Sequence, residues 1–354
     1  MKLDRRLLDL FGIDKPILLA PMAGSADVDL AIAVARAGGL GAIPCALITP
    51  EQAEAQAQFF RGQIDAPLNL NFFCHTPAAP DAARDERWRE RLAPYAQEYG
   101  VALSADPPRG GREPFSDAYC QMVERVRPKV VSFHFGLPAD DLLARVKAAG
   151  ALVISSATNV EEARWLEDRG CDAIIAQGAE AGGHRGMFLT EDVSAQIGTM
   201  ALVPLIVDAV RVPVIAAGAI ADGRGIAAAF CLGAAGAQIG TALLKCPEAK
   251  LGALHRAALE RGGETTLTNV MTGRPARGLY NRLMREVGPL SVDAPAFPDQ
   301  AAALAPLKAA AEARGADDFT NLWSGQAAAL SKVEPAAEKL QRIWNEAEAL
   351  LQSR

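Results

Sequence analysis

Residues 177–186 read Gln-Gly-Ala-Glu-Ala-Gly-Gly-His-Arg-Gly and directly follow the apolar run 173–176. A short apolar run that ends in a glycine loop is typical of a buried strand with a turn at its carboxyl end. In parallel α/β proteins, these strand ends carry the functional groups. His184, one of four histidines in the chain, is therefore a candidate catalytic imidazole, beside glycines that let a planar ligand approach the backbone. The alternative is a tight turn whose histidine only hydrogen-bonds the scaffold.

The rest of the chain repeats this pattern of apolar runs. Eight such runs, rich in Val, Ile and Leu, predict strands at 17–20, 40–43, 68–71, 130–133, 151–155, 173–176, 213–216 and 236–239. Stretches of helical period lie between most of them, at 28–37, 50–60, 140–149, 160–169, 190–210 and 223–232. Asp27 and Thr158 are expected to cap helices, and Gly38, Gly150 and Gly170 to follow helix ends. Eight units favour an α/β fold, a (β/α)8 TIM barrel, over an open doubly wound sheet.

Two segments do not fit the repeat, and we expect them to form an added helical subdomain over one barrel mouth. The segment after Phe73 is too long for one crossover, and the region after Cys246, with its alanine-rich stretch 301–313, has helical character without strands. The predicted barrel comprises residues 1–72, 129–250 and 325–354. The predicted subdomain comprises residues 73–128 and 251–324. A long final helix over 334–352 is expected to pack back on the barrel.

Composition excludes several classes of protein. The formal net charge of −6 over 354 residues, without a cluster of Lys and Arg, disfavours nucleic-acid binding. No apolar run reaches the roughly 18 residues of a membrane span, and no signal core follows the N-terminus, so we expect a soluble, cytoplasmic protein. The six cysteines are scattered and are expected to be reduced. No metal site is expected, even at the adjacent Cys74 and His75.

Further strand ends carry candidate ligand-binding residues. Met22 and Ala23 follow the first strand in a stretch of small residues that leaves room for a flat ring, although Met22 alone is more typical of a core. Asn71, at the third strand, either presents its amide to a ligand or caps a turn. His134, at the fourth strand, lies on the same rim as His184, and a structural role is favoured slightly for it.

The turns after the seventh and eighth strands predict a phosphate site. Gly218 lies in the first turn, and Gln238, Ile239, Gly240 and Thr241 form the second. Many barrels bind a phosphate at this pair of turns through backbone N–H groups and a helix N-terminus. Glycine removes the Cβ that would block an oxyanion, and Thr241 adds a hydroxyl donor. Two ordinary turns are the alternative.

In this order and spacing, the sequences at 21–24, 69–75, 177–186, 216–220 and 238–241 resemble the class I branch of the nitronate monooxygenase family, formerly called 2-nitropropane dioxygenases. The resemblance covers nearly the whole chain. It implies a non-covalent FMN across the barrel mouth and His184 as catalytic base or substrate anchor. The cofactor-binding residues it implies are Met22, Ala23, Asn71, Gln177, Gly182, Gly183, Gly218, Gln238, Ile239, Gly240 and Thr241. His134 and Arg185 are expected to assist at the substrate.

One position departs from the family pattern. The family usually has two glycines after the seventh strand, whereas Ala219 follows Gly218 here. The extra methyl group is tolerable if Ala219 has a negative φ.

The resemblance also implies a reaction. An alkyl nitronate such as propionate 3-nitronate and O2 would give a carbonyl compound and nitrite by way of a flavin semiquinone. The implied partners are this small nitronate and O2, with the protein a monomer or homodimer. The first alternative is an FMN-dependent NAD(P)H:quinone or enoyl-thioester reductase on the same barrel. The second, more distant, is a non-redox phosphate-binding barrel.

Overall fold

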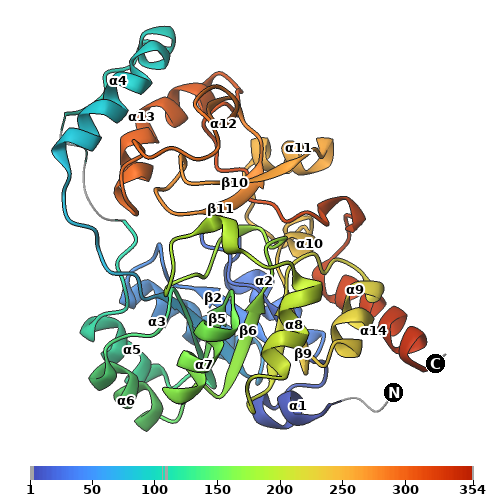
Figure 1. Cartoon of the computed structure of the whole chain (residues 1–354). Coiled ribbons are helices and arrows are strands. Elements are labelled where there is room, and N and C mark those ends of the chain that lie inside the picture. Colours follow the sequence, from blue (N-terminus) through green and yellow to red (C-terminus); the bar gives the residue numbers. More distant parts are fainter. Residues whose placement is uncertain (1–3, 106, 108–110, 353–354) are drawn as a thin grey trace.

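Eight parallel strands close into a barrel (Figure 1). The structure is a computed structural model, and it describes residues 4–105, 107 and 111–352. The barrel strands are β1 (Ile17–Leu19), β2 (Gly41–Pro44), β3 (Leu68–Phe73), β4 (Val130–His134), β5 (Leu152–Ala157), β6 (Ala173–Gln177), β8 (Val214–Ala217) and β9 (Gly236–Ile239). They neighbour one another in the order β1-β9-β8-β6-β5-β4-β3-β2. Leu40 closes the ring by a parallel bridge to Leu18, so the predicted TIM barrel is confirmed.

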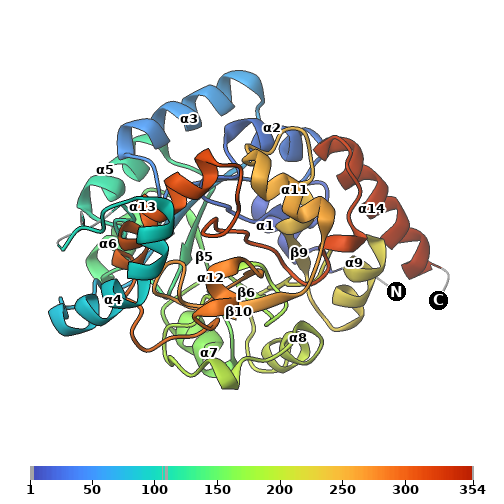
Figure 2. The ribbon, with the colours of Figure 1, turned by 90° about the horizontal axis from the view of Figure 1, so that it is seen from above.

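A ring of helices surrounds the barrel, as the view from above shows (Figure 2). They are α2 (Val28–Arg36), α3 (Pro50–Gln63), α5 (Asp117–Val126), α6 (Asp140–Ala148), α7 (Val160–Asp168), α8 (Thr199–Val207), α9 (Gly223–Cys231) and α14 (Ala336–Gln352). Each turns buried apolar residues toward the strands. The expected final helix is α14, which packs against α9 and α2 and so completes the ring. The short helix α1 (Arg6–Phe11) closes the opposite end of the barrel with Leu7, Leu8 and Phe11.

A second apolar core lies above the barrel mouth (Figure 1). It joins α4 (Ala82–Tyr99), α12 (Arg282–Glu286) and α13 (Asp299–Ala313), and its buried side chains include Trp88, Leu307 and Phe319. The division into two domains and its boundaries stay a prediction. Because α5 packs against α3 and α6, the segment 73–128 contains one helix of the barrel ring as well as α4.

Three details of the sequence prediction are wrong. The region after Cys246 contains two strands, β10 (Thr265–Thr268) and β11 (Ala276–Leu279), whose short polar sequences carry little strand signal. The helix predicted over 190–210 begins only at Thr199, because the Glu180 carboxylate accepts a hydrogen bond from the Thr199 N–H at 2.8 Å. Asn159, not Thr158, caps α7 by accepting from the N–H of Glu162.

The other predicted helix cap and the predicted helix-ending glycines are confirmed. Asp27 caps α2 by accepting from the N–H of Asp29. Gly38, Gly150 and Gly170 adopt φ values of 86°, 89° and 81° directly after their helices, a region that favours glycine.

At Gly41, helix α2 approaches barrel strand β2 closely. A Cβ at this position would lie 2.4 Å from the carbonyl oxygen of Ala31 in α2. We expect Gly41→Ala to lower the free energy of unfolding by about 2–3 kcal/mol, because backbone must shift to admit the methyl group. Urea denaturation measures this change.

The matched control is Gly62→Ala in α3, where nothing lies within 4 Å of the added Cβ. This change is expected to raise the free energy of unfolding by up to about 1 kcal/mol, since alanine is the better helix former. Equal effects of the two substitutions would contradict the packing inferred at Gly41.

Candidate active site

The carboxyl ends of the barrel strands open into one pocket. Twelve of the residues predicted from the sequence line it: Met22, Ala23, Asn71, His134, Gln177, Gly182, Gly183, His184, Gly218, Gln238, Gly240 and Thr241. The position in doubt, Ala219, lines it as well. Residues from the upper part of the molecule, among them Arg112 and Trp323, complete the wall.

The backbone of His184 is fixed by both parts of the protein. With Gly183 it forms the two-residue strand β7 (Gly183–His184), which pairs with β11 of the upper sheet. From the barrel side, its carbonyl oxygen accepts hydrogen bonds from Gln177 Nε2 at 2.9 Å and from His134 Nε2 at 3.1 Å. Gln177 also accepts from the Gly186 N–H at 2.7 Å, so its amide spans the loop. The glycine motif is therefore a rigid loop.

The imidazole of His184 is half-buried in the pocket wall and neutral. Its Nε2 lies 2.9 Å from Thr272 Oγ1, and its ring lies beside Phe297 and Trp323, with centroids 5.4 and 5.6 Å away. Burial, followed by the charge of Arg112, lowers the pKa of His184 well below its ordinary value. No described residue bonds Nδ1. This nitrogen is therefore available to a ligand in the pocket.

His134 supports His184. A carbonyl oxygen only accepts, so His134 Nε2 carries the hydrogen that binds His184, and Nδ1 accepts from Ser156 Oγ at 3.1 Å. Burial lowers the pKa of His134 to about 4, which keeps this neutral tautomer at physiological pH. Both ring nitrogens are occupied, in agreement with a structural role.

Arg185 and Ile239 do not line the pocket. The Arg185 guanidinium is fully buried and donates to the carbonyl oxygens of Gln177 and Gly178 at 2.5 and 2.6 Å and to Gln196 Oε1 at 2.7 Å. The structure therefore gives no support to the predicted substrate contact of Arg185. Ile239 points into the core, and its carbonyl oxygen accepts from the Ala20 N–H.

The turns after β8 and β9 form a candidate anion site. Among the described residues, no acceptor is bonded to the backbone N–H groups of Ala219, Ile220 and Ala221, or of Thr241 at the start of α10 (Thr241–Leu244). Thr241 Oγ1 accepts from the Gly325 N–H at 2.9 Å and keeps its own hydrogen for another acceptor. Successive free N–H groups in a left-handed turn are suited to an oxyanion.

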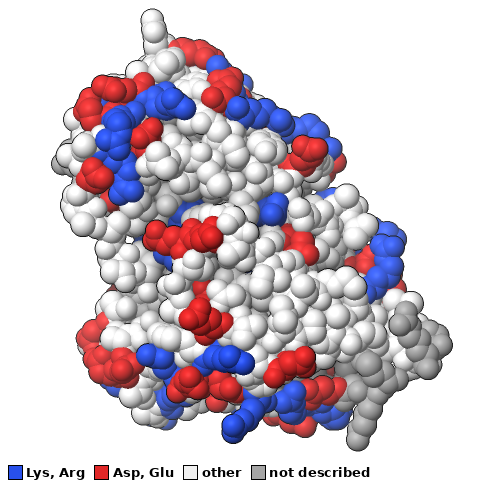
Figure 3. Space-filling view, viewed as in Figure 1, with Lys and Arg blue, Asp and Glu red and all other residues white. Residues whose placement is uncertain are grey.

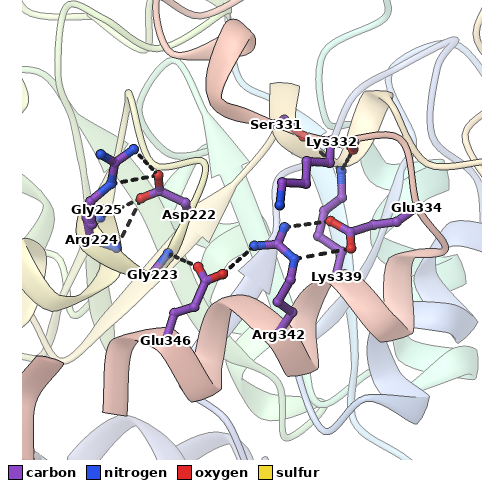
Figure 4. Close-up of polar contacts among 10 residues, drawn as sticks. All are labelled: Asp222, Gly223, Arg224, Gly225, Ser331, Lys332, Glu334, Lys339, Arg342 and Glu346. Atoms are coloured by element: carbon purple, nitrogen blue, oxygen red, sulfur yellow. Dashed lines mark hydrogen bonds and ion pairs between the residues drawn. The ribbon is translucent and has the colours of Figure 1, made fainter. Parts of the chain in front are cut away.

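The N-terminus of α9 is not open to an anion, contrary to the expected helix contribution (Figure 4). Asp222 caps it by accepting from the N–H groups of Arg224 and Gly225. Glu346 of α14 accepts from the Gly223 N–H at 3.1 Å. Two carboxylates thus accept from the first turn of α9. The free N–H groups, those of residues 219–221, lie before this helix, in the loop after β8.

Ala219 has a φ of +55°, so the condition under which its methyl group was expected to be unstrained is not met. Left-handed backbone costs a residue with a Cβ about 1–2 kcal/mol. Phe135, beside His134, also has a positive φ, of 69°. Strained residues at the rim of a pocket are typical of functional sites.

Several pocket residues carry no sequence signal. Thr272, Arg112 and Trp323 lie in loops outside the strand–helix repeat, and only the folded chain brings them to His184. Asn71, predicted at the site, donates across the sheet to Ser132 Oγ at 3.0 Å instead of capping a turn.

The surface and the composition of the described residues exclude two further kinds of site. Positive and negative side chains are interspersed over the face in Figure 3, without one large field of either sign. Within residues 4–105, 107 and 111–352, no helix is long and apolar enough to cross a membrane. In the same part of the chain, no three His, Cys, Asp or Glu side chains are grouped to hold a metal ion.

Barrel and pocket together define a (β/α)8 enzyme in which a neutral imidazole and the candidate anion site lie on one rim. A family model described as nitronate monooxygenase matches residues 4–346. The nitronate monooxygenase of Pseudomonas aeruginosa is 43% identical over 96% of this chain and 98% of its own length. That of Paraburkholderia phytofirmans is 42% identical over 97% of this chain and 94% of its own. The chain belongs to the nitronate monooxygenase family and is an oxidoreductase.

Solved structures agree with this family. The nitroalkane oxidase of Streptomyces ansochromogenes superposes with a TM-score of 0.90 at 38% identity, over 98% of this chain and 99% of that one. FabK of Thermotoga maritima superposes with a TM-score of 0.75 at 27% identity, over 98% and 97%.

Ala219 offers a test of strain in the β8 turn. We expect Ala219→Gly to raise the free energy of unfolding by about 0.5–1 kcal/mol, the left-handed strain relieved less the backbone entropy of glycine. Ala221→Gly, two residues on at a buried position outside the left-handed region, should lower it by about 1 kcal/mol. Thermal unfolding of both variants checks the pair, and destabilisation by Ala219→Gly would show that no strain is stored there.

Proposed function

We propose that the protein is an FMN-dependent nitronate monooxygenase, which oxidises alkyl nitronates such as propionate 3-nitronate with O2 to a carbonyl compound and nitrite. The observation that carries the proposal is that the neutral His184 and the free N–H groups of the β8 and β9 turns line the same pocket. The family supplies the reaction class. FMN needs a phosphate site at one end and a substrate beside its ring at the other, and this pocket offers both.

The residues of the pocket fit FMN. The loop N–H groups of 219–221 and the Thr241 hydroxyl would hold the phosphate. Gln238 Oε1 is buried without a hydrogen-bond partner among the described residues. It can therefore accept a hydrogen bond from a ribityl hydroxyl or a ring N–H of the cofactor. Nothing lies within 4 Å of a Cβ added at Gly183, which leaves space for a flat ring. Met22, Ala23, Asn71, Gln177 and Gly182 would complete the cofactor site.

Not every glycine in the pocket wall is explained by space for a cofactor. A Cβ at Gly182 would lie 2.5 Å from the Gly325 nitrogen, so this glycine admits the segment that precedes α14. Its contact with FMN would therefore be through the backbone.

When bound, FMN would supply the electron acceptor for the nitronate, and O2 would be the final oxidant. The protein positions the reactants and controls one proton. Thr272 Oγ1 lies near both His184 Nε2 and the Arg274 carbonyl oxygen, at 2.9 and 3.4 Å, and its hydroxyl can donate to either. If it donates to Arg274, His184 Nδ1 is an unprotonated base; if it donates to His184, Nδ1–H binds a nitronate oxygen. One neutral imidazole thus serves both neutral nitroalkanes and nitronates.

The first test is oxygen uptake by the purified protein with propionate 3-nitronate, with FMN content measured on the same sample. We expect a yellow protein that consumes O2 rapidly and releases nitrite. A yellow protein that ignores nitronates, yet whose FMN is bleached by NADH, would indicate the reductase alternative. A colourless protein unable to take up FMN would contradict both and leave the non-redox barrel.

His184→Asn tests the role of the imidazole. We expect the variant to retain FMN and to lose about 100-fold or more in kcat/KM on a neutral nitroalkane, because the base is removed. Turnover of the matching nitronate, which needs no proton removal, should fall far less and is the internal control. Unchanged nitroalkane turnover would exclude His184 as the base.

The lowered pKa of His184 predicts a pH profile. An unprotonated base is present above its pKa, so a pKa well below the ordinary value extends activity to lower pH. We expect kcat/KM for a neutral nitroalkane to stay level from about pH 7.5 to 5.5. Initial rates across this range check it, and a loss with an apparent pKa near 6.5 would contradict the buried environment described for this imidazole.

A further inference from the structure

Arg112 is a cation in the pocket wall, and no described residue provides it with a counter-ion. It lies in the described segment between α4 and α5, and its guanidinium stands over the Phe297 ring, 5.9 Å from the centroid. No hydrogen bond or ion pair joins it to any described residue. Burial lowers the pKa of Arg112, which shows that its charge is held at a cost. An anion that accepts its fixed array of donors would offset this cost.

The second arginine of this region differs. Arg274 lies 4.1 Å from the centroid of the Phe135 ring, donates to the Met187 carbonyl oxygen at 2.6 Å, and feels the negative charges of Glu191 and Glu162. Its guanidinium therefore has a structural role on the rim. Arg112 has no such partner, so it is the one of the two that is suited to a ligand.

His75 lies beside the same aromatic ring and is also unpartnered. Its side chain is buried, its ring meets Phe297 edge-on at 4.7 Å between centroids, and neither ring nitrogen bonds a described residue. Buried imidazoles without any partner are rare in folded proteins. A ligand that reaches Arg112 would bring an acceptor toward this ring as well.

Phe297 connects this group to the reacting centre. The ring lies 5.4 Å from that of His184, so Arg112 and His184 flank one side chain. Phe73 and Phe135 surround Phe297, with centroids 6.1 and 5.7 Å away, and supply apolar walls. The arrangement fits a short molecule with an apolar middle, one polar end at His184 and a second, anionic end at Arg112.

We propose that Arg112 is a specificity-determining residue, which binds a carboxylate at the far end of the nitronate substrate and selects such dianions over neutral-chain alkyl nitronates. The planar guanidinium binds a carboxylate through two parallel N–H···O bonds. This inference rests on the proposed oxidation of nitronates and assigns the recognition of their side chain to a residue that the sequence motifs do not include.

The test compares two nitronates of equal length, propionate 3-nitronate and propyl 1-nitronate, on the FMN-loaded enzyme. We expect the unmodified enzyme to prefer the carboxylate substrate. Arg112→Met should lower its kcat/KM about 100-fold, mainly through KM, and change that of propyl 1-nitronate less than threefold. The kcat/KM of Arg112→Lys for propionate 3-nitronate should lie between those of the unmodified enzyme and Arg112→Met, because lysine keeps the charge but not the planar, two-pronged donor group. Arg61→Met in α3, whose arginine donates to the Arg127 carbonyl oxygen, is the matched control and should leave both values unchanged.

Two results would overturn the proposal. An equal loss on both substrates would place Arg112 at the nitronate group or in the scaffold, and no loss on either would remove it from the binding site. If the unmodified protein oxidises neither nitronate, the proposed reaction fails, and calorimetric binding of 3-nitropropionate against 1-nitropropane decides the inference alone. Tighter binding of 3-nitropropionate that disappears in Arg112→Met would support the inference. Equal binding of the two compounds by the unmodified protein would refute it.

Discussion

Two side chains of the barrel converge on a single atom, the carbonyl oxygen of His184. Gln177 at the end of β6 and His134 at the end of β4 both donate to it, while β7 pairs on its other side with β11. Each hydrogen bond contributes only about 1 kcal/mol, yet together they fix the imidazole relative to the barrel and to the structure above it. The segment contains four glycines, and three of them, Gly178, Gly182 and Gly186, lie where an added Cβ would clash with a neighbouring residue.

Burial has opposite consequences for the two kinds of base in the pocket. A histidine removed from water loses its proton, and the lowered pKa values of His184 and His134 show this response. An arginine cannot lose its proton at any physiological pH, so Arg112 remains charged in the same surroundings. One apolar environment therefore yields both a neutral proton acceptor and a permanent cation.

The repeating strands and helices of the barrel could be predicted from the sequence, whereas contacts between segments outside the repeat could not. All eight barrel strands were recognisable because each is a short apolar run between helical periods, and the glycine motif placed His184 correctly in the pocket wall. Arg185 belongs to the same motif but turns inward, and only its hydrogen bonds reveal that. Thr272 and Arg112 reach the site through contacts between distant segments, which no local period encodes. Ala219 shows a further limit, since a residue type does not reveal its φ.

Helix α14 completes the ring of helices between α9 and α2. It also supports both turns of the candidate anion site. Glu346 accepts from the Gly223 N–H after the first turn (Figure 4). Lys339 donates to the Ala242 carbonyl oxygen after the second turn, at 2.7 Å. During translation this helix is made after all eight strands, about a hundred residues behind β9. A nascent chain therefore has every donor of the anion site before it has the supports that hold them in place. Helix α14 therefore supports the two turns only late in synthesis, after every strand of the barrel has been made.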